Sequence, residues 1–447
     1  MRKLSRIKFG LLAVPLWAIA CAAFQSNLYA QADVQRGTPQ REGRAWVEHD
    51  TCAATVRDGA RLVVRTDFGS ITVKPGPSGR MDCRIDLRSF RGSEEEARRS
   101  LRGYEVGIRS LENGGVMLTG RATGPQAHNS LAVNYQITVP MKFNVDLETN
   151  GGDLNVAALD GDFRGTTQGG DITAGDISGP VRALTSGGDI RLGNIGQNLE
   201  ARTAGGDIRL QDVKGDAILE TSGGEIVAGT ISGSVSARSA GGDIVMRGAS
   251  GPVRAETAGG QIQIGQCQDT VHAQTAGGNI RLHGAKGLVV AQTAGGAIDL
   301  FRMQSAVRAQ TAAGPILVEI NANRDSFAAS QLQTAVGDIQ VFLPSDLPMN
   351  IDAAIAQAFG HKIVSDFPLQ FRFQFSHGQE APRYGPKRAE ATVNGGGKVL
   401  RLRVEQGNIW IHKIDPKTIE ELKAQQEAFW KMWKDRLKQL SDKDGDQ

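Results

Sequence analysis

Hydrophobic and polar positions along most of this chain repeat with a period of eighteen residues. Aligned copies read approximately T-A-G-G-D-I-x-L-x-x-V-x-G-x-V-x-A-x. The Gly pairs that mark the copies show no insertion or deletion from 151/152 to 295/296, and a degenerate copy follows at 313/314. Apolar residues alternate with polar ones on both sides of a turn, which is the pattern of two short β-strands with one buried face.

Several columns of apolar residues therefore face the interior in every copy. The column after the acidic position is always isoleucine: Ile172, Ile190, Ile208, Ile226, Ile244, Ile262, Ile280, Ile298 and Ile316. A strand pair this short cannot bury its apolar face alone, but copies stacked at about 4.8 Å build a continuous core. The pattern predicts an all-β fold, a parallel β-solenoid with 18-residue coils. We expect right-handed winding because parallel crossovers are almost always right-handed.

The flanking regions carry weaker versions of the same pattern. Ser93 and Glu96 predict a short capped helix within an N-terminal β region that caps the stack. Asp415-Pro416 predicts the start of an amphipathic C-terminal helix. The predicted organisation is a signal peptide (1–32), a flexible leader (33–48), the irregular N-terminal β region (49–144), the regular solenoid (145–320), irregular C-terminal coils (321–414), and the helix with a disordered tail (415–447).

The N-terminus predicts export. A basic stretch precedes the apolar run at 9–24, and Ala30-Gln31-Ala32 forms a cleavage site, so the mature chain would begin near Asp33. The alternative is a lipoprotein anchored through Cys21. Either form would reside in the periplasm, on the outer-membrane surface or outside the cell. We expect no transmembrane span in the mature chain.

Export favours disulfide chemistry for the cysteines. Cys52 and Cys83 are the candidate pair, and Cys267 occupies an apolar repeat position typical of an inert core thiol. The chain contains no C-x-x-C or H-x-x-x-H spacing, so we expect no metal and no other cofactor.

Composition narrows the function classes. The formal net charge is +3, which offers no basic footprint for nucleic acid. Glycine is abundant, with 56 residues, and aromatic residues make up only 5%. This balance favours turn-rich β structure over a globular α/β enzyme.

A column of hydroxyl residues precedes each Gly pair and shares the inward face. Its members include Thr185, Thr203, Thr221, Ser239, Thr257, Thr275 and Thr293. We expect them to form a structural ladder that passes hydrogen bonds between layers. The alternative, an ice-binding Thr array, requires outward side chains.

A column of acidic residues follows each Gly pair on the outward face. Arg191 and Arg209 stand two residues after members of this column, so we expect a neutralising lattice of ion pairs. The alternative is a row of calcium or polysaccharide contacts, for which the candidate residues are Asp171, Asp189, Asp207 and Asp243.

The remaining candidates are few. His272 and His283 fall on outward or turn positions, without a Ser or Asp at triad-like intervals, and we expect no enzyme. In the C-terminal helix, Phe429, Trp430 and Trp433 are candidates for packing on the final coils as a lid. They could otherwise bind a partner or a membrane surface.

The order of motifs resembles a known bacterial group. The segment YQITVP, the repeated S/T-x-G-G-D-I-x-L coils and the ending VNGGGKVLRL…GNIWIH are similar to the uncharacterised β-strand-repeat family known as "putative adhesins". The similarity spans roughly residues 55–414. It implies an exported β-solenoid and brings no agreed activity and no catalytic residues.

These observations predict a non-enzymatic cell-envelope or surface scaffold that binds an unknown protein or glycan. One alternative is a polysaccharide lyase or hydrolase on a β-helix. Another is an envelope-stress or assembly component that acts through the C-terminal helix.

Overall fold

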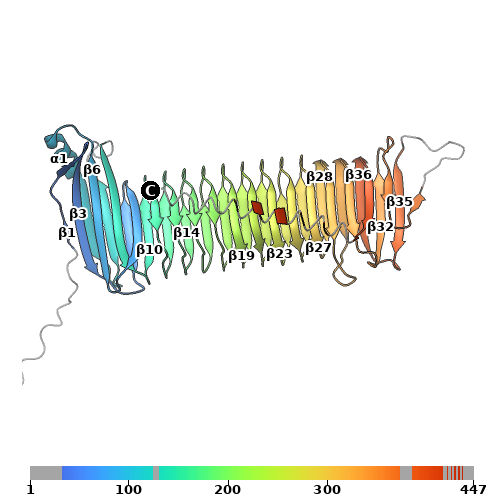
Figure 1. The fold of residues 1–447 in the computed structure, drawn as a ribbon, viewed down its shortest axis with the longest axis horizontal. Coiled ribbons are helices and arrows are strands. Elements are labelled where there is room, and N and C mark those ends of the chain that lie inside the picture. Colours follow the sequence, from blue (N-terminus) through green and yellow to red (C-terminus); the bar gives the residue numbers. More distant parts are fainter. Residues whose placement is uncertain are drawn as a thin grey trace, which may run out of the picture.

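The computed structural model describes residues 33–123, 130–372 and 385–415, together with seven helical residues between 420 and 435. Two long β-sheets face each other and form a rod (Figure 1). Sheet A has 19 strands and sheet B has 18. The predicted all-β parallel solenoid is confirmed.

Each coil of the regular part contributes one strand to each sheet. The strands of sheet A are β11 (Leu154–Val156), β13 (Ile172–Ala174), β15 (Ile190–Leu192), β17 (Ile208–Leu210), β19 (Ile226–Ile231), β21 (Ile244–Ala249), β23 (Ile262–Cys267), β25 (Ile280–Ala285), β27 (Ile298–Met303) and β29 (Ile316–Ile320). Those of sheet B are β10 (Asn144–Thr149), β12 (Phe163–Thr167), β14 (Val181–Leu184), β16 (Leu199–Arg202), β18 (Ala217–Thr221), β20 (Val235–Ser239), β22 (Val253–Thr257), β24 (Val271–Gln274), β26 (Val289–Thr293) and β28 (Val307–Ala313).

Neighbouring strands are parallel and in register with the repeat. Ile190 pairs with Ile172 on one side and with Ile208 on the other, as the sequence predicts. A third row runs through the bend after sheet A, where Ile177 bridges to Leu159 and Ile195. From β19 onward the strands of sheet A extend through this bend. The inward rows merge into one buried core along the rod.

The hydroxyl column joins each coil to the one before it. Thr203 Oγ1 donates to the carbonyl oxygen of Gly188 in the preceding coil (2.8 Å) and accepts from the N–H of Gly206 in its own coil (3.2 Å). The same two bonds recur at Thr167, Thr185, Thr221, Ser239, Thr257, Thr275 and Thr293. These side chains are buried. Their partners are backbone groups of the corner rather than neighbouring hydroxyls.

The second glycine of each pair lies where two coils approach most closely. A Cβ on Gly170 would overlap the carbonyl group of Gly152, and one on Gly206 would overlap that of Gly188. A Cβ on Gly169, the first of its pair, would meet nothing within 4 Å. Gly152 has a positive φ of 129°, whereas Gly170 and Gly206 do not fall in that region. Close approach of the backbones, rather than a left-handed conformation, therefore requires glycine at the regular corners.

Antiparallel strands close the N-terminal end. This end consists of β1 (Val34–Gln35), β2 (Gln40–Glu42), β3 (Ala45–Thr55), β4 (Arg61–Thr66), β5 (Ser70–Gly76), β6 (Arg80–Ser89), α1 (Glu94–Arg102), β7 (Tyr104–Ser110), β8 (Val116–Ala122) and β9 (Leu131–Pro140). The coil β4–β5 lies out of chain order, between the later segment β8–β9 and the regular coil β10–β11. Strands β3, β6 and β9 then continue sheet A in antiparallel fashion.

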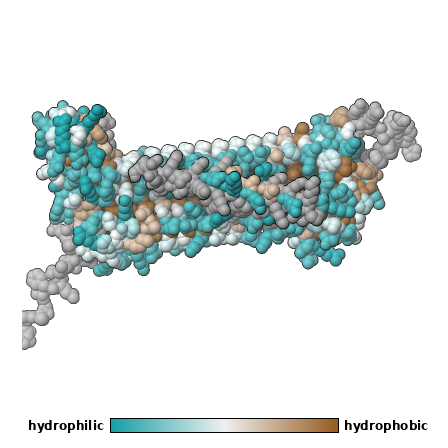
Figure 2. Space-filling view, in the orientation of Figure 1, coloured by the Kyte–Doolittle hydropathy of each residue, from teal (hydrophilic) through white to brown (hydrophobic). Residues whose placement is uncertain are grey.

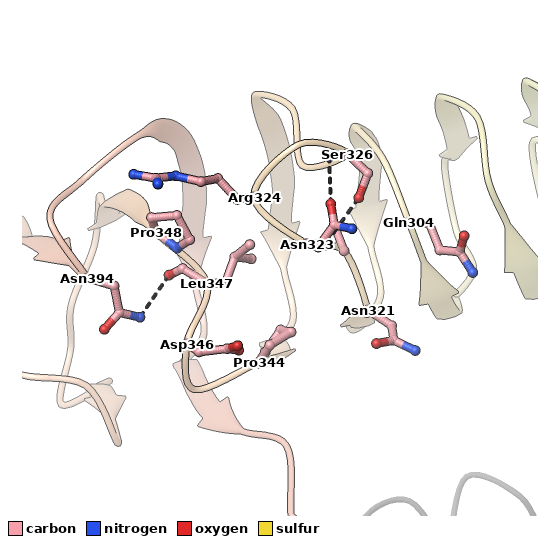
Figure 3. Close-up of a pocket in the computed structure, with 11 residues that line it drawn as sticks. Gln304, Asn321, Asn323, Arg324, Ser326, Pro344, Asp346, Leu347, Pro348 and Asn394 are labelled. Carbon is pink, nitrogen blue, oxygen red and sulfur yellow. Dashed lines mark hydrogen bonds between the residues drawn. The ribbon is translucent and has the colours of Figure 1, made fainter.

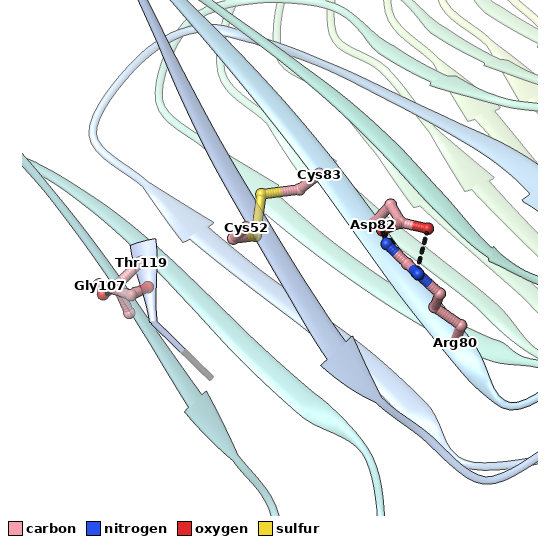
Figure 4. Close-up of a disulfide and its surroundings, with 6 residues drawn as sticks. All are labelled: Cys52, Arg80, Asp82, Cys83, Gly107 and Thr119. Atoms are coloured by element: carbon pink, nitrogen blue, oxygen red, sulfur yellow. Dashed lines mark hydrogen bonds and ion pairs between the residues drawn. A yellow bond between two sulfur atoms is a disulfide. The ribbon is translucent and has the colours of Figure 1, made fainter. Parts of the chain in front are cut away.

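Two local features secure this N-terminal end. Ser93 caps α1 by accepting the backbone N–H of Glu96 (3.3 Å), and α1 packs against β3, β6 and β7. Cys52 and Cys83 lie opposite each other on β3 and β6 and form a disulfide, with Cα atoms 4.9 Å apart (Figure 4).

The flexible leader predicted for 33–48 is wrong for the described residues, because β1, β2 and the start of β3 lie there. The mostly polar residues of β1 and β2 do not show the alternation of apolar and polar positions by which strands were predicted elsewhere. Both strands pair with β3, so the backbone gains its hydrogen bonds without a buried apolar face.

The C-terminal end also contains a coil out of chain order. Its strands are β30 (Ser330–Val336), β31 (Ile339–Leu343), β32 (Met349–Ile355), β33 (Ile363–Ser365), β34 (Gln370–Arg372), β35 (Lys387–Val393), β36 (Lys398–Gln406) and β37 (Ile409–Lys413). The last coil, β36–β37, lies between β30–β31 and β32–β33. Antiparallel β35 and β34 then close sheet B.

Replacing the second glycine of a pair should be far more damaging than replacing the first. We expect Gly170→Ala to destabilise the rod by about 1–3 kcal/mol, because the new methyl group collides with backbone that cannot move without breaking sheet A. Gly169→Ala, with open space around its Cβ, is the matched control and should stay near the parent. Urea unfolding followed by circular dichroism measures the difference. Equal midpoints for the two variants would contradict this account of the corner.

Removing one hydroxyl from the ladder should also weaken the rod. Thr203→Val keeps the shape of the side chain but leaves the Gly188 carbonyl and the Gly206 N–H without their partner, which costs about 1–3 kcal/mol. Thr203→Ser keeps both bonds, and serine already occupies this column at Ser239. We expect thermal unfolding to separate the Val variant from both the parent and the Ser variant; a Val variant as stable as the parent would show that the ladder adds nothing.

Candidate functional site

The repeat is interrupted between β29 and β30. Thr311 pairs with Thr334 of the next coil, a step of 23 residues in place of 18. The additional residues form a loop at 321–329 that projects from the rod. The preceding regular coils keep the 18-residue step, so this loop is a distinct surface feature of the rod.

A cavity of about 850 Å³ lies beside this loop (Figure 3). One wall comes from the loop, and the other comes from the turn at 344–348 and the turn between β35 and β36. Its lining is dominated by amide, guanidinium, carboxylate and hydroxyl groups, which belong to Gln304, Asn321, Asn323, Arg324, Ser326, Asp346 and Asn394. Ala322, Pro344, Leu347 and Pro348 complete it.

Hydrogen bonds within both walls hold the cavity in shape. Asn323 Oδ1 accepts the backbone N–H groups of Asp325 (3.1 Å) and Ser326 (2.9 Å), while Phe327 is buried beneath the loop. On the opposite wall, Asn394 Nδ2 donates to the carbonyl oxygens of Ser345 (3.0 Å) and Leu347 (3.1 Å). The walls therefore exist before any ligand binds, which lowers the cost of binding.

The chemistry of the cavity suits a polar ligand. The exposed side chains of Asn321, Arg324 and Asp346 offer both donors and acceptors, the set that recognises hydroxyl groups. None of the lining residues is aromatic, so the cavity supplies no stacking face for a sugar ring.

A second cavity, of about 820 Å³, lies on sheet B toward the C-terminal end and includes Phe371, which is 46% exposed. Figure 2 shows exposed hydrophobic surface at this end of the rod. Arg403 and Arg388 line the cavity and both contact Asp352. Burial raises the pKa of Asp352, but its hydrogen bond with Arg403 and the nearby guanidinium groups outweigh burial and hold the pKa below its usual value.

The outward acidic column binds backbone and arginine. Asp171 Oδ1 accepts the N–H of Asp189 in the next coil (2.8 Å), and Asp189 does the same for Asp207 (2.8 Å). Arg191 bridges Asp171 (2.8 Å) and Asp189 (2.5 Å), while Arg209 contacts Asp207 (2.7 Å). In the last candidate position, Asp243 accepts the N–H of Gln261 (2.8 Å).

The calcium alternative gains no support from this geometry. Within residues 33–123, 130–372, 385–415 and the seven helical positions, no three His, Cys, Asp or Glu side chains gather as metal ligands. These four carboxylates instead accept backbone N–H groups of the next coil, and those of Asp171, Asp189 and Asp207 are also neutralised by Arg191 or Arg209.

Three titratable side chains of the regular coils, His272, His283 and Cys267, are partly or fully buried. His272 is half-buried on the outer face of β24. His283 takes an outward position on β25, yet only 2% of it is exposed, and its ring stacks on Phe301 at 5.7 Å. Burial, with smaller effects of Arg281 and Arg302, lowers the pKa of His283 to about 4. Cys267 is a buried free thiol, and burial raises its pKa to about 12.

Sequence reasoning missed one histidine cluster. His49 Nδ1 contacts Asp86 (2.5 Å) and Arg84 (3.0 Å), and its Nε2 contacts Glu42 (3.2 Å). Both ring nitrogens thus meet charged groups, which is an ion-pair network rather than a nucleophile and its base. The cavity at the 321–329 loop was missed as well, although the 23-residue step was a visible signal.

The predicted partner residues of the C-terminal helix, Phe429, Trp430 and Trp433, lie outside the described residues. Among those that are described, Ala428 and Met432 line a cavity of about 380 Å³ against sheet A. No helix in the described part of the chain is long and apolar enough to cross a bilayer.

Comparison with known proteins agrees with the resemblance seen in the sequence. Residues 109–283 match the Toastrack DUF4097 family, a domain of unknown function. No curated protein matches the chain. A "putative cell adhesion protein" from Clostridium sporogenes ATCC 15579 is 9% identical, with a TM-score of 0.17, over 81% of this chain and 99% of its own. A "putative adhesin" from Bacteroides fragilis NCTC 9343 is 13% identical, with a TM-score of 0.23, over 66% of this chain and 96% of its own.

The buried histidine predicts a loss of stability in acid. Above pH 6.5, His283 is neutral in both the folded and the unfolded chain and has no effect on pH dependence. Between pH 6.5 and 4 the unfolded chain takes up a proton that the folded chain does not, so stability falls by up to about 3 kcal/mol. His283→Gln should flatten this part of the stability curve, measured by urea unfolding at several pH values. An unchanged slope in the His283→Gln variant would contradict the assignment.

Proposed function

We propose that this chain is a non-enzymatic, exported binding scaffold whose cavity at the 321–329 loop holds a polar ligand, a glycan of the cell envelope. The observation that carries the proposal is the preformed, hydrogen-bonding cavity at the break in the repeat. Amides and charged groups converge there on space that the chain itself leaves open.

The regular coils support a scaffold rather than a catalyst. Their inward hydroxyls bond to corner backbone, and their outward carboxylates bond to backbone N–H groups or arginine. With strands about 4.8 Å apart, sheets of this size make a rod of roughly 80 Å, long enough to hold a binding site away from a surface.

Export is supported by the sequence and by the disulfide. The basic and apolar N-terminal stretches with their cleavage site are typical of a signal peptide. The Cys52–Cys83 bond is of the kind that persists in oxidising compartments.

Binding of envelope glycans to the mature chain tests this proposal. A glycan array identifies the ligand, and calorimetry then compares Asn321→Ala and Arg324→Ala with the parent. Each variant should weaken binding about tenfold or more, because each removes a hydrogen-bonding group, charged in the case of Arg324, from the cavity.

Arg164→Ala is the matched control, since this exposed arginine lies on sheet B far from the loop. Unchanged affinity in both cavity variants would place the site elsewhere. Release of shortened glycan products would show an enzyme and overturn the proposal, as would a failure to bind any envelope glycan.

A further inference from the structure

Part of the outer face of sheet A is covered, whereas an outward aliphatic residue of sheet B is exposed. Val227 and Val245 occupy adjacent outward positions of β19 and β21, between Arg209 and Gln263 of the same column. Both valines are 0% exposed. Ile218, the comparable outward aliphatic residue on sheet B, is 39% exposed. An outward side chain of a solenoid is fully buried only when another segment lies over it.

A second column on the same face is covered as well. His283, Phe301 and Glu319 follow one another in β25, β27 and β29, and they are 2%, 5% and 6% exposed. Gln211, which holds the equivalent position nearer the N-terminus, is exposed. The covered area therefore extends from β19 to β29 and ends before the first regular coils.

The described part of the C-terminal segment lies against this area. Ala428 and Met432 are helical and share a cavity with outward residues of four successive coils, which are Gln263, Arg281, Asp299, Phe301 and Leu317. These helical residues, red in Figure 1, run beside the middle of the rod. The chain leaves β37 beyond β31, so by Met432 it has turned back along sheet A toward the N-terminal end.

Helix geometry fits this path. An α-helix rises about 1.5 Å per residue, and coils are spaced at about 4.8 Å, so roughly three residues of helix pass each coil. A stripe of apolar residues at every third or fourth position would thus meet one coil after another. The sequence places Phe429, Trp433 and Leu440 on such a stripe. A helix continued past Met432 in the same direction would pass the coils of Val245 and Val227.

We propose that the C-terminal segment that carries Ala428 and Met432 docks along the outer face of sheet A as an amphipathic helix and shields its apolar patch, defined here as Val227, Val245, Phe301 and Leu317. The occupant of this face is therefore a segment of the same chain. Detaching it would expose both the patch and the tryptophan-bearing face of the helix to a second copy of the chain.

Disulfide trapping tests the docking. Met432→Cys is combined with Gln263→Cys or Leu317→Cys in the mature chain, and with Gln274→Cys on the outer face of sheet B as the matched control. Native Cys267 is buried and does not compete. We expect an intramolecular crosslink under mild oxidation with at least one sheet A partner and none with the control. Equal trapping with all three partners, or with none, would overturn the proposal.

Charge placed beneath the helix gives an independent measurement. The double variant Val227→Lys/Val245→Lys should release the segment, so that trypsin cleaves at Lys423, Lys431 and Lys434 at least tenfold faster than in the parent. Ile218→Lys on sheet B is the control and should leave cleavage unchanged. Circular dichroism shows whether the rod stays folded. Parent-like cleavage of a folded double variant would contradict docking, whether or not the chain binds a glycan.

Discussion

The close approach of backbones at the corner of each coil is the constraint on which the rod depends. The carbonyl group of one corner occupies the space that a Cβ of the next corner would need, so Gly170, Gly206 and their equivalents tolerate no side chain. The same carbonyl accepts the hydroxyl of the next coil, as Gly188 accepts Thr203. The close backbone contact and the hydroxyl hydrogen bond thus both require the same distance between successive corners. Any insertion at the corner would break both at once, which explains why the Gly pairs recur without a single shift.

This constraint also decides where a ligand can bind. Inside the regular coils the hydroxyls of the ladder are bonded to corner backbone, and on the acidic column the carboxylates accept backbone N–H groups of the following coil, as Asp189 accepts that of Asp207. Side chains that are available to bind a ligand are therefore expected where the 18-residue repeat is interrupted. The 321–329 loop is such a place, because its five additional residues leave the corner intact on either side while opening a cavity between two stabilised turns. The outer face of sheet A is another, because outward residues are free of the corner constraint.

The inward-facing residues could be predicted from the sequence, because apolar and polar residues alternate along each short strand. The Ile column and the buried hydroxyls follow directly from strand parity. The ends could not be predicted in the same way. The coils β4–β5 and β36–β37 follow the common pattern of apolar positions. That pattern predicts the shape of a coil, but it does not predict which other coil will stack on it. The candidate cavity depends on turns at 321–329, 344–348 and Asn394, which are distant in sequence and share no motif. The burial of His283 was hidden for a similar reason, since its parity is outward.

The two coils that lie out of chain order follow from the need to close a stack. A sheet edge with unpaired backbone groups invites association with other chains, and a solenoid has such an edge at each end of both sheets. If the chain simply stopped winding, its last coil would be that edge.

Here the last coil, β36–β37, is instead inserted between β30–β31 and β32–β33, so both of its sides are paired. The outermost positions fall to the short strands β33 and β34, and at the other end to β1, β2 and β7, strands that differ in sequence from the repeat. These end strands are short or antiparallel and do not repeat the 18-residue pattern, so they offer a poorer template for another copy than a regular coil would. The inserted coil β36–β37 therefore lies between the coil that continues the rod, β30–β31, and the strands that end it. It also means that the C-terminal segment leaves the rod from β37, beside the outer face of sheet A.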